Sequence, residues 1–127
     1  MANPADVKAL LDRYCTAMSE KHREEWLDCF ADDAVQEDPV GAAPNHGRAA
    51  IGAFFDSNPV PIHIYQTHDP LVIGNEVLAF FAVDADIDGT MMHLPRIIDH
   101  IVLTDDGTKF QRLRAFFDMT ELGPKGN

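Results

Sequence analysis

The hydrophobic pattern of the chain changes once, near Pro59, from a period of about 3.6 residues to a period of two. Before that point, the first predicted helix has one apolar face, formed by Val7, Leu10, Leu11, Tyr14 and Met18. After it, residues 76–87 carry an apolar side chain at every second position: Val77, Ala79, Phe81, Val83, Ala85 and Ile87. Helices followed by hairpin-linked strands predict an α+β fold with an antiparallel sheet.

Local signals set the expected bounds of the elements. Asn3 followed by Pro4 predicts the start of the first helix, because Asn caps helices and Pro suits their first position. A second helix is expected over residues 20–30 and a third over 49–56, with His46 as its cap. Between them, residues 34–38 are expected to be extended and to lead into a turn.

The strands are expected over residues 61–67, 76–87, 90–104 and 108–122. The Asp69-Pro70 pair is expected to end the first of them, and Pro95 predicts a bulge in the third. We therefore expect a single domain over residues 1–127. Its three N-terminal helices would pack on a strongly curved, mainly antiparallel sheet and form a cone with an apolar cavity.

The net charge of −11 limits what the chain can bind. Nucleic acids and anionic membrane surfaces need a basic patch, so neither is an expected partner. The charge also disfavours an anionic substrate unless a basic group lies at the site, and a small neutral, apolar ligand fits better. We see no signal peptide and no segment long enough to span a bilayer, and expect a cytoplasmic protein.

The sequence predicts neither a metal site nor a cofactor. Cys15 and Cys29 have no metal-ligand spacing and are expected to be buried thiols. The histidines form neither HxH nor HExxH, and no nucleotide-binding or nucleophile motif is present. Residues 84–89 resemble the start of a calcium loop, but its twelfth position is Pro95 instead of Glu. We expect those aspartates to form the solvent face of a strand.

Asp99 is the most informative polar residue. Strand alternation places it with Ile97, Ile101 and Leu103 on the more apolar face of its strand. A buried carboxyl either finds a cationic partner or stays protonated, and a protonated carboxyl is a strong hydrogen-bond donor. The sequence leaves both readings open, with three arginines as possible structural partners: Arg96, Arg112 and Arg114.

Tyr14 and Asp38 are each open to an ordinary structural reading. Tyr14 lies on the apolar face of the first helix, where a tyrosine is commonly a packing residue. Asp38 precedes Pro39, and Asp-Pro is a common turn opener. Apolar neighbours, Val35 and Val40, would raise the basicity of Asp38 if they desolvate it.

Together these residues resemble bacterial ketosteroid isomerase, a family in the group of cone-shaped folds that includes nuclear transport factor and SnoaL-like cyclases. The resemblance extends over residues 7–122 and rests on four segments: Arg13-Tyr14, Ala31-Asp32-Asp33-Ala34 with Glu37-Asp38-Pro39, His46-Gly47-Arg48, and Ile98-Asp99. It implies that Asp38 is the catalytic base and that Tyr14 and a protonated Asp99 bind the oxyanion; ketosteroid isomerase is itself the standard example of such a neutral carboxyl.

The resemblance further implies an isomerase that moves the double bond of a 3-oxo-Δ5-steroid into conjugation, without a cofactor and as a homodimer. The expected walls of the steroid site are Val40, Phe54, Phe55, Phe80, Phe116 and Phe117. The sequence departs from the family at Phe30 and Phe55, where many members carry tyrosines that hydrogen-bond to the oxyanion tyrosine.

Two other interpretations remain open. One is a different enzyme on the same fold, either a SnoaL-like cyclase or an epoxide hydrolase with Arg96, Asp99 and Asp118 around a water. Arg96 and Asp99 differ by an odd number and should face opposite sides of a regular strand, unless a bulge intervenes. The other is a steroid- or polyketide-binding module that does no chemistry.

Overall fold

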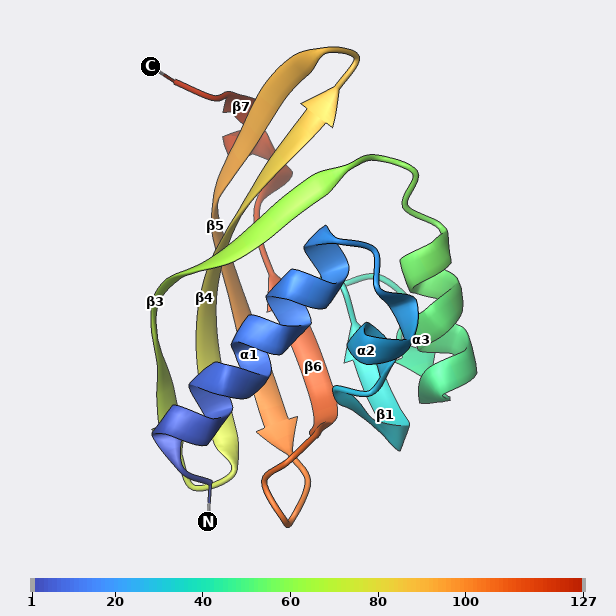
Figure 1. Ribbon diagram of the computed structural model, residues 1–127, viewed down its shortest axis with the longest axis vertical. Helices are drawn as coiled ribbons and strands as arrows, with labels where there is room; N and C mark the ends of the chain where they lie inside the picture. Colours follow the sequence, from blue (N-terminus) through green and yellow to red (C-terminus); the bar gives the residue numbers. More distant parts are fainter. Residues whose placement is uncertain (1, 127) are drawn as a thin grey trace.

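The computed structural model describes residues 2–126, in which three helices cover one side of a curved sheet (Figure 1). The helices are α1 (Pro4–Ser19), α2 (Arg23–Leu27) and α3 (Gly47–Asp56). A short 3-10 helix, Met119–Glu121, lies near the C-terminus. The strands are β1 (Phe30–Glu37), β2 (Asn45–His46), β3 (Ile62–Ile73), β4 (Glu76–Ile87), β5 (Thr90–Leu103), β6 (Phe110–Phe116) and β7 (Gly123–Pro124). The predicted α+β class is confirmed.

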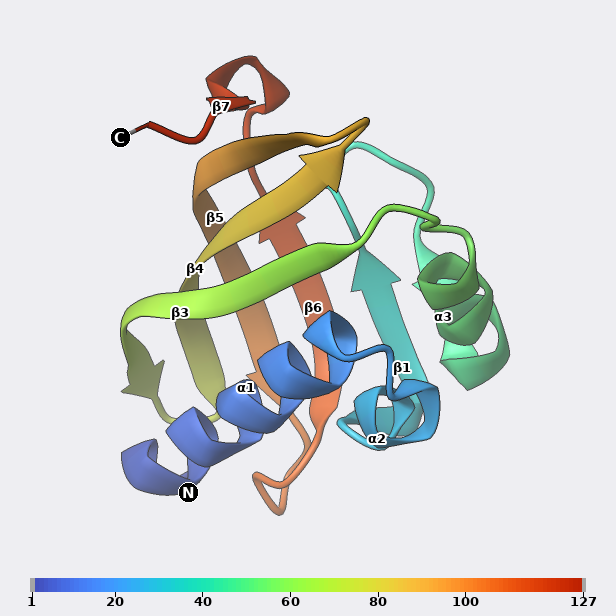
Figure 2. The ribbon, with the colours of Figure 1, turned by 45° about the horizontal axis from the view of Figure 1, so that its top comes forward.

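The sheet is mixed, because one of its pairs is parallel. Its strand order is β2-β1-β6-β5-β4-β3, and β7 pairs with β5 beside this path. Only β1 and β6 run parallel, and the other paired strands are antiparallel. Figure 2 shows the sheet curling so that its concave side faces α1, α2 and α3. This curl creates the space that a flat sheet would not enclose.

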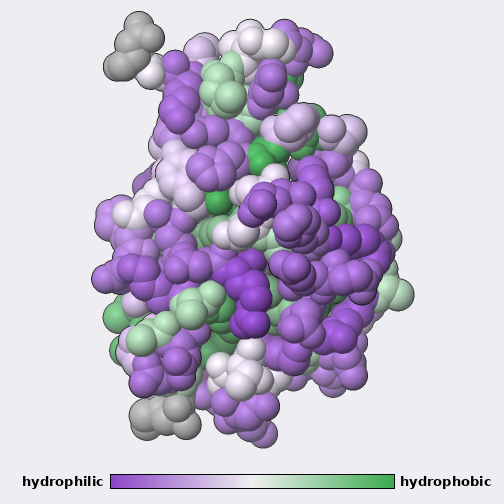
Figure 3. All heavy atoms as spheres, viewed as in Figure 1, coloured by the Kyte–Doolittle hydropathy of each residue, from purple (hydrophilic) through white to green (hydrophobic). Residues whose placement is uncertain are grey.

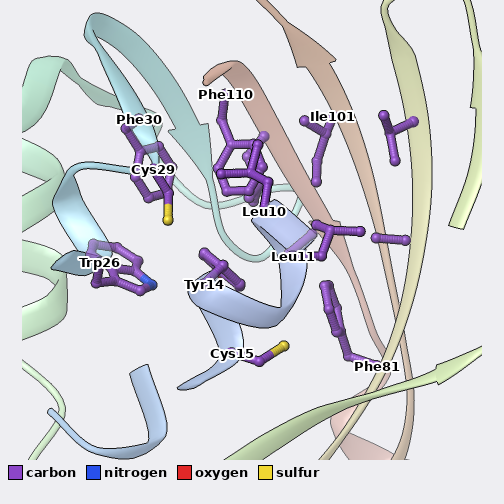
Figure 4. Packing of buried hydrophobic residues seen from close by; sticks show 14 of the residues in the cluster. Leu10, Leu11, Tyr14, Cys15, Trp26, Cys29, Phe30, Phe81, Ile101 and Phe110 are labelled. Carbon is purple, nitrogen blue, oxygen red and sulfur yellow. The ribbon is translucent and has the colours of Figure 1, made fainter. Parts of the chain in front are cut away.

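The core fills the space between α1 and the concave side of the sheet, with Tyr14 at its centre. Figure 4 shows Tyr14 on α1 between Trp26 and Phe81, with the aromatic rings of β1 and β6 close by. The ring centroids of Tyr14 and four aromatic neighbours are 5.5–6.2 Å apart: Trp26, Phe30, Phe81 and Phe110. Both cysteines are buried free thiols, as predicted.

The first helix begins where the sequence predicts. The side chain of Asn3 accepts a hydrogen bond from the backbone N–H of Ala5 at 2.8 Å, and Pro4 is the first helical residue. The predicted cap of α3 is wrong in part: His46 occupies the N-cap position, but its side chain makes no capping hydrogen bond. Gly47 follows it with φ of +83°, a conformation that favours glycine.

The predicted second helix is too long, because strand pairing takes over its C-terminal end. α2 ends at Leu27, and β1 already begins at Phe30. The backbone carbonyl of Cys29 accepts a hydrogen bond from the N–H of Phe110 at 2.8 Å. The helical spacing of Trp26 and Phe30 in the sequence therefore reflects two buried residues in different elements.

The predicted break at Asp69-Pro70 is also wrong, because β3 continues through it to Ile73. The pairing of β3 with β4 shifts register between Gln66 and His68 and again between His68 and Leu71. β3 is at the edge of the sheet, where a proline without an N–H removes no essential bond. The predicted bulge near Pro95 is confirmed by the shift between the pairs Phe81–Ile97 and Val83–Leu94.

The last predicted strand ends early. β6 stops at Phe116, and Asp118 then caps the 3-10 helix by accepting a hydrogen bond from the N–H of Thr120 at 2.9 Å. The chain returns to pair with β5, with Gly123 opposite His93. Within residues 2–126, no helix has both the length and the apolar content to cross a bilayer.

Candidate active site

Two carboxyl groups lie at the same level of the sheet, two strands apart, with an alanine of the middle strand between them. Asp99 on β5 pairs with Ala115 on β6, and the register Glu37–Arg114 places Asp38 beside the same alanine. The backbone N–H of Val40 donates to the carbonyl of Ala115 at 2.8 Å and ties the segment after β1 to this rung. Two strand spacings separate the backbones of Asp38 and Asp99 by about 10 Å.

Asp99 is buried without a charged partner. Its side chain is only 2% exposed, and its Oδ1 is a buried oxygen with no hydrogen-bond partner in the described residues. The cross-strand neighbours of Asp99 are Ala79 and Ala115, neither of which can donate a side-chain hydrogen bond.

The arginines considered as partners of Asp99 bond elsewhere. Arg96 Nη2 is 2.6 Å from Glu121 Oε2, and Arg114 Nε donates to Glu37 Oε1 at 2.9 Å. Arg112 is not among the ion pairs formed within residues 2–126. Of the two readings that the sequence leaves open, the structure therefore favours the unpaired carboxyl.

Burial separates the protonation states of the two carboxyls. Burial, and next to it the charge of Asp38, raises the pKa of Asp99 well above its usual range. Burial raises the pKa of Asp38 to about 6. Burial therefore favours the neutral acid at Asp99, and it makes Asp38 a stronger base than a solvent-exposed carboxylate.

Tyr14 supplies a second neutral donor. Burial, followed by the charges of Asp99 and Asp38, raises the pKa of Tyr14 well above its usual range, so the hydroxyl stays protonated. Phe30 and Phe55, where many ketosteroid isomerases carry tyrosines, offer no hydroxyl. Phe30 packs edge-on against Tyr14, and the ring centroids of Phe55 and Trp26 are 4.9 Å apart. The ring of Tyr14 is thus packed among aromatic side chains without hydroxyls, and Tyr14 lines the cavity described next.

Tyr14, Asp38 and Asp99 line one cavity of about 480 Å³ on the concave side of the sheet. Its walls are mainly apolar and come from every layer of the fold: Met18, Phe54, Phe55, Pro59, Val60, Ile62, Ile64, Val83, Ala85, Ile87, Leu94, Ile97, Ala115, Phe117, Met119 and Leu122. In Figure 3 strongly hydrophobic residues are visible in a recess below the β4–β5 hairpin, on an otherwise mostly hydrophilic face. A mostly apolar cavity with a few convergent polar groups is typical of a small-molecule site.

Three of the six predicted wall residues line this cavity, namely Phe54, Phe55 and Phe117. The placement of Phe80 and Phe116 is wrong. Phe80 alternates with the inward-facing residues of β4, and Phe116 pairs with Ile98 on the opposite face of the sheet from Asp99. Phe116 is 43% exposed. Val40 is also outside the lining, although its backbone is bonded to Ala115, which lines the cavity.

Several wall residues were not predicted from the sequence. Ile97 and Leu94 lie on β5 either side of the bulge, and Met119 and Leu122 come from the C-terminal segment that folds back over the sheet. The period-two pattern could have identified Ile97, because it shares a face with Asp99. No local pattern marks the C-terminal pair.

The remaining acidic residues of interest take structural roles. Asp84, expected in solvent, is 6% exposed and bonds to His93 Nδ1 at 2.7 Å and to Lys125 Nζ. The cluster considered for an epoxide hydrolase is not brought together at the cavity, because Asp99 lines it and Arg96 and Asp118 do not. Asp118 caps the 3-10 helix, and Arg96 pairs with Glu121. Within residues 2–126, no three His, Cys, Asp or Glu side chains gather to hold a metal ion.

Comparisons with known proteins identify the fold. The family model of the SnoaL-like domain matches residues 11–117. The epoxide hydrolase/cyclase-like enzyme SalBIII, from pyran ring formation in the polyether salinomycin, is 26% identical with a TM-score of 0.85, over 98% of this chain and 100% of that one. A Δ5-3-ketosteroid isomerase from Mycobacterium sp. is 23% identical with a TM-score of 0.78, over 94% and 98%. A Mycobacterium tuberculosis protein in complex with estradiol-17β-hemisuccinate is 19% identical, also at 0.78, over 93% and 98%.

Proposed function

The chain belongs to the family of SnoaL-like domains, and from this premise and the geometry of its cavity we propose that it is a steroid Δ5-isomerase. The proposed reaction moves the double bond of a 3-oxo-Δ5-steroid into conjugation with the ketone. The observation that carries the proposal is the pair of carboxyls beside Ala115, of which one is suited to act as a base and the other as a neutral donor. The Mycobacterium isomerase of the same fold supports it as an analogy.

The chemistry needs a base and an oxyanion site. Asp38 would take the proton from carbon 4 of the steroid and return it to carbon 6, so the reaction is redox-neutral and balanced. Negative charge builds on the ketone oxygen in the dienolate, where Tyr14 and Asp99 would donate hydrogen bonds. The apolar walls would bind the fused rings and exclude water, which strengthens both hydrogen bonds.

The proposal is tested by mixing the protein with 5-androstene-3,17-dione and following the ultraviolet absorbance of the conjugated enone. Enzymatic turnover supports the isomerase. If no turnover occurs, binding of equilenin, a phenolic steroid, separates two alternatives. Binding without turnover favours a binding module, and absence of binding removes steroids as ligands.

A second candidate function is ring formation by epoxide opening. The similarity to SalBIII favours it, because that enzyme has the higher identity and TM-score of the two solved enzymes compared above. The same groups fit this chemistry: neutral Asp99 would protonate the epoxide oxygen while Asp38 takes the proton of an attacking hydroxyl. Conversion of a hydroxy-epoxide to a cyclic ether, without enone formation from the ketosteroid, would favour this candidate. The homodimer expected from the resemblance stays a prediction in either case.

The acid limb of the pH profile should report Asp38. With a neutral steroid substrate, we expect kcat/KM to fall tenfold per pH unit below about pH 6, because Asp38 acts only as the carboxylate and its pKa is raised to about 6. The measurement is kcat/KM between acidic and neutral pH for wild type and Asp99→Asn. Burial is the cause of the Asp38 shift, so the limb should stay near pH 6 in both proteins. An inflection near pH 4 would contradict the assignment.

Replacing Tyr14 should mainly affect the chemical step. We expect Tyr14→Phe to lower kcat on the order of 10²–10³-fold with little change in KM, because its bond to the oxygen strengthens as charge develops. Tyr65→Phe is the matched control, since Tyr65 lies outside the cavity with its hydroxyl 3.5 Å from Asp84. Equal rates for the two variants would remove Tyr14 from the oxyanion site.

A further inference from the structure

One cationic side chain lies at the rim of the cavity, apart from the polar groups of Tyr14, Asp38 and Asp99. Lys21 follows the C-terminus of α1 and is the only basic residue among the described lining residues. Tyr14 lies five residues before the last residue of α1, so roughly 8 Å of helix axis separates it from the point where the chain leaves the helix towards Lys21. This separation is comparable to the length of a fused four-ring skeleton.

The ammonium group of Lys21 is held over the cavity but is not neutralised. Its Nζ lies 5.7 Å from the ring centroid of Phe55, a wall residue, and makes a long contact of 3.5 Å to the carbonyl of Asn58. None of the ion pairs within residues 2–126 includes Lys21. In a chain of net charge −11, an unpaired cation at a ligand site favours an anionic partner.

The other polar residues of the rim are already bonded to backbone. Ser57 Oγ donates to the carbonyl of Phe54 at 2.7 Å, and Asn58 Oδ1 accepts from the N–H of Val60 at 3.1 Å. Lys21 itself has φ of +60°, an uncommon conformation for a residue other than glycine. Its backbone is fixed by a bond from its N–H to the carbonyl of Met18 at 3.3 Å.

We propose that Lys21 determines substrate specificity by pairing with a carboxylate at the end of the steroid opposite its ketone. The preferred substrates would then be 3-oxo-Δ5-steroids with an acidic side chain, not neutral diones. The proposal rests on the isomerase function, because Tyr14 and Asp99 fix the ketone end. It also reconciles an acidic protein with an anionic ligand, since the carboxylate would lie beside the unpaired ammonium group of Lys21.

The experiment compares 3-oxochol-5-en-24-oic acid with its methyl ester, which differs only at the distal charge. We expect wild type to prefer the acid by roughly fivefold in kcat/KM, mostly through KM, and the preference to shrink at high salt. Lys21→Met should abolish the preference and Lys21→Arg should restore it. Lys8→Met, which removes a lysine outside the cavity, should keep it.

An equal rate for acid and ester in wild type, or a preference that survives in Lys21→Met, would overturn the proposal. Failure of the proposed isomerase function gives a different result, because then neither wild type nor any variant would convert either steroid. In that event the acid-to-ester ratio is measured as dissociation constants from the fluorescence of Trp26, the single tryptophan, which packs on Phe55. Equal dissociation constants for the acid and the ester in wild type would count against the role of Lys21. Tighter binding of the acid that is lost in Lys21→Met would support it.

Discussion

Asp38→Asn is expected to lower kcat for isomerisation by about 10⁴-fold, at the upper end of what one acid–base group contributes. Both proton transfers depend on this side chain, because the same carboxylate removes the proton and returns it. The amide preserves the shape of the side chain and cannot accept the proton. The measurement is the rate of enone formation under saturating 5-androstene-3,17-dione.

The control for this variant lies on β1, the strand that precedes Asp38. Asp33→Asn changes an exposed carboxyl of β1 that bonds to Gln111 outside the cavity, and it should retain the wild-type rate. Asp38→Glu should recover part of the lost activity, since it restores a base at a shifted position. A rate for Asp38→Asn within tenfold of wild type would exclude Asp38 as the base.

Asp99→Asn is expected to gain stability relative to wild type as the pH rises. Burial raises the folded-state pKa of Asp99 above its unfolded value, so this residue favours folding at low pH and loses that contribution as pH increases. While the folded protein holds the proton and the unfolded chain does not, the unfolding free energy falls by about 1.4 kcal/mol per pH unit. The stability of the variant relative to wild type should therefore increase with pH until Asp99 ionises in the folded protein.

The measurement is the free energy of unfolding by denaturant titration at several pH values above 6.5, a range chosen to lie above the pKa of Asp38, which is about 6. Titrating groups that do not interact with Asp99 are common to both proteins and cancel in the difference. Asp33→Asn again serves as the control, with a difference from wild type that does not change with pH. A flat difference for Asp99→Asn would mean that Asp99 is ionised in the folded protein, and the oxyanion site would lose its neutral acid.

The sequence predicted the features that local chemistry determines. The cap at Asn3, the bounds of β4 and the bulge near Pro95 all appear where the residue types indicate. The burial of Asp99 followed from period-two alternation alone, because Ile97 and Ile101 on either side are apolar.

The remaining features depend on partners distant in the chain. α2 ends early because Cys29 bonds to β6, and β3 continues through Pro70 because it lies at the sheet edge. Asp84 is buried because Lys125 returns from the C-terminus to cover it. Phe80 and Phe116 face away from the cavity because side chains alternate along β4 and β6, and their aromatic character does not change that alternation.

The central claim is that Asp38 carries one proton between two carbons of a bound ketosteroid. The most direct measurement uses 5-androstene-3,17-dione with deuterium at the transferred position of carbon 4, with mass spectrometry of the conjugated product. Asp38 is partly buried at the cavity, so we predict that the product forms and retains part of the deuterium at carbon 6. Absence of the conjugated enone, or a product that has lost the entire label to solvent, would contradict the account.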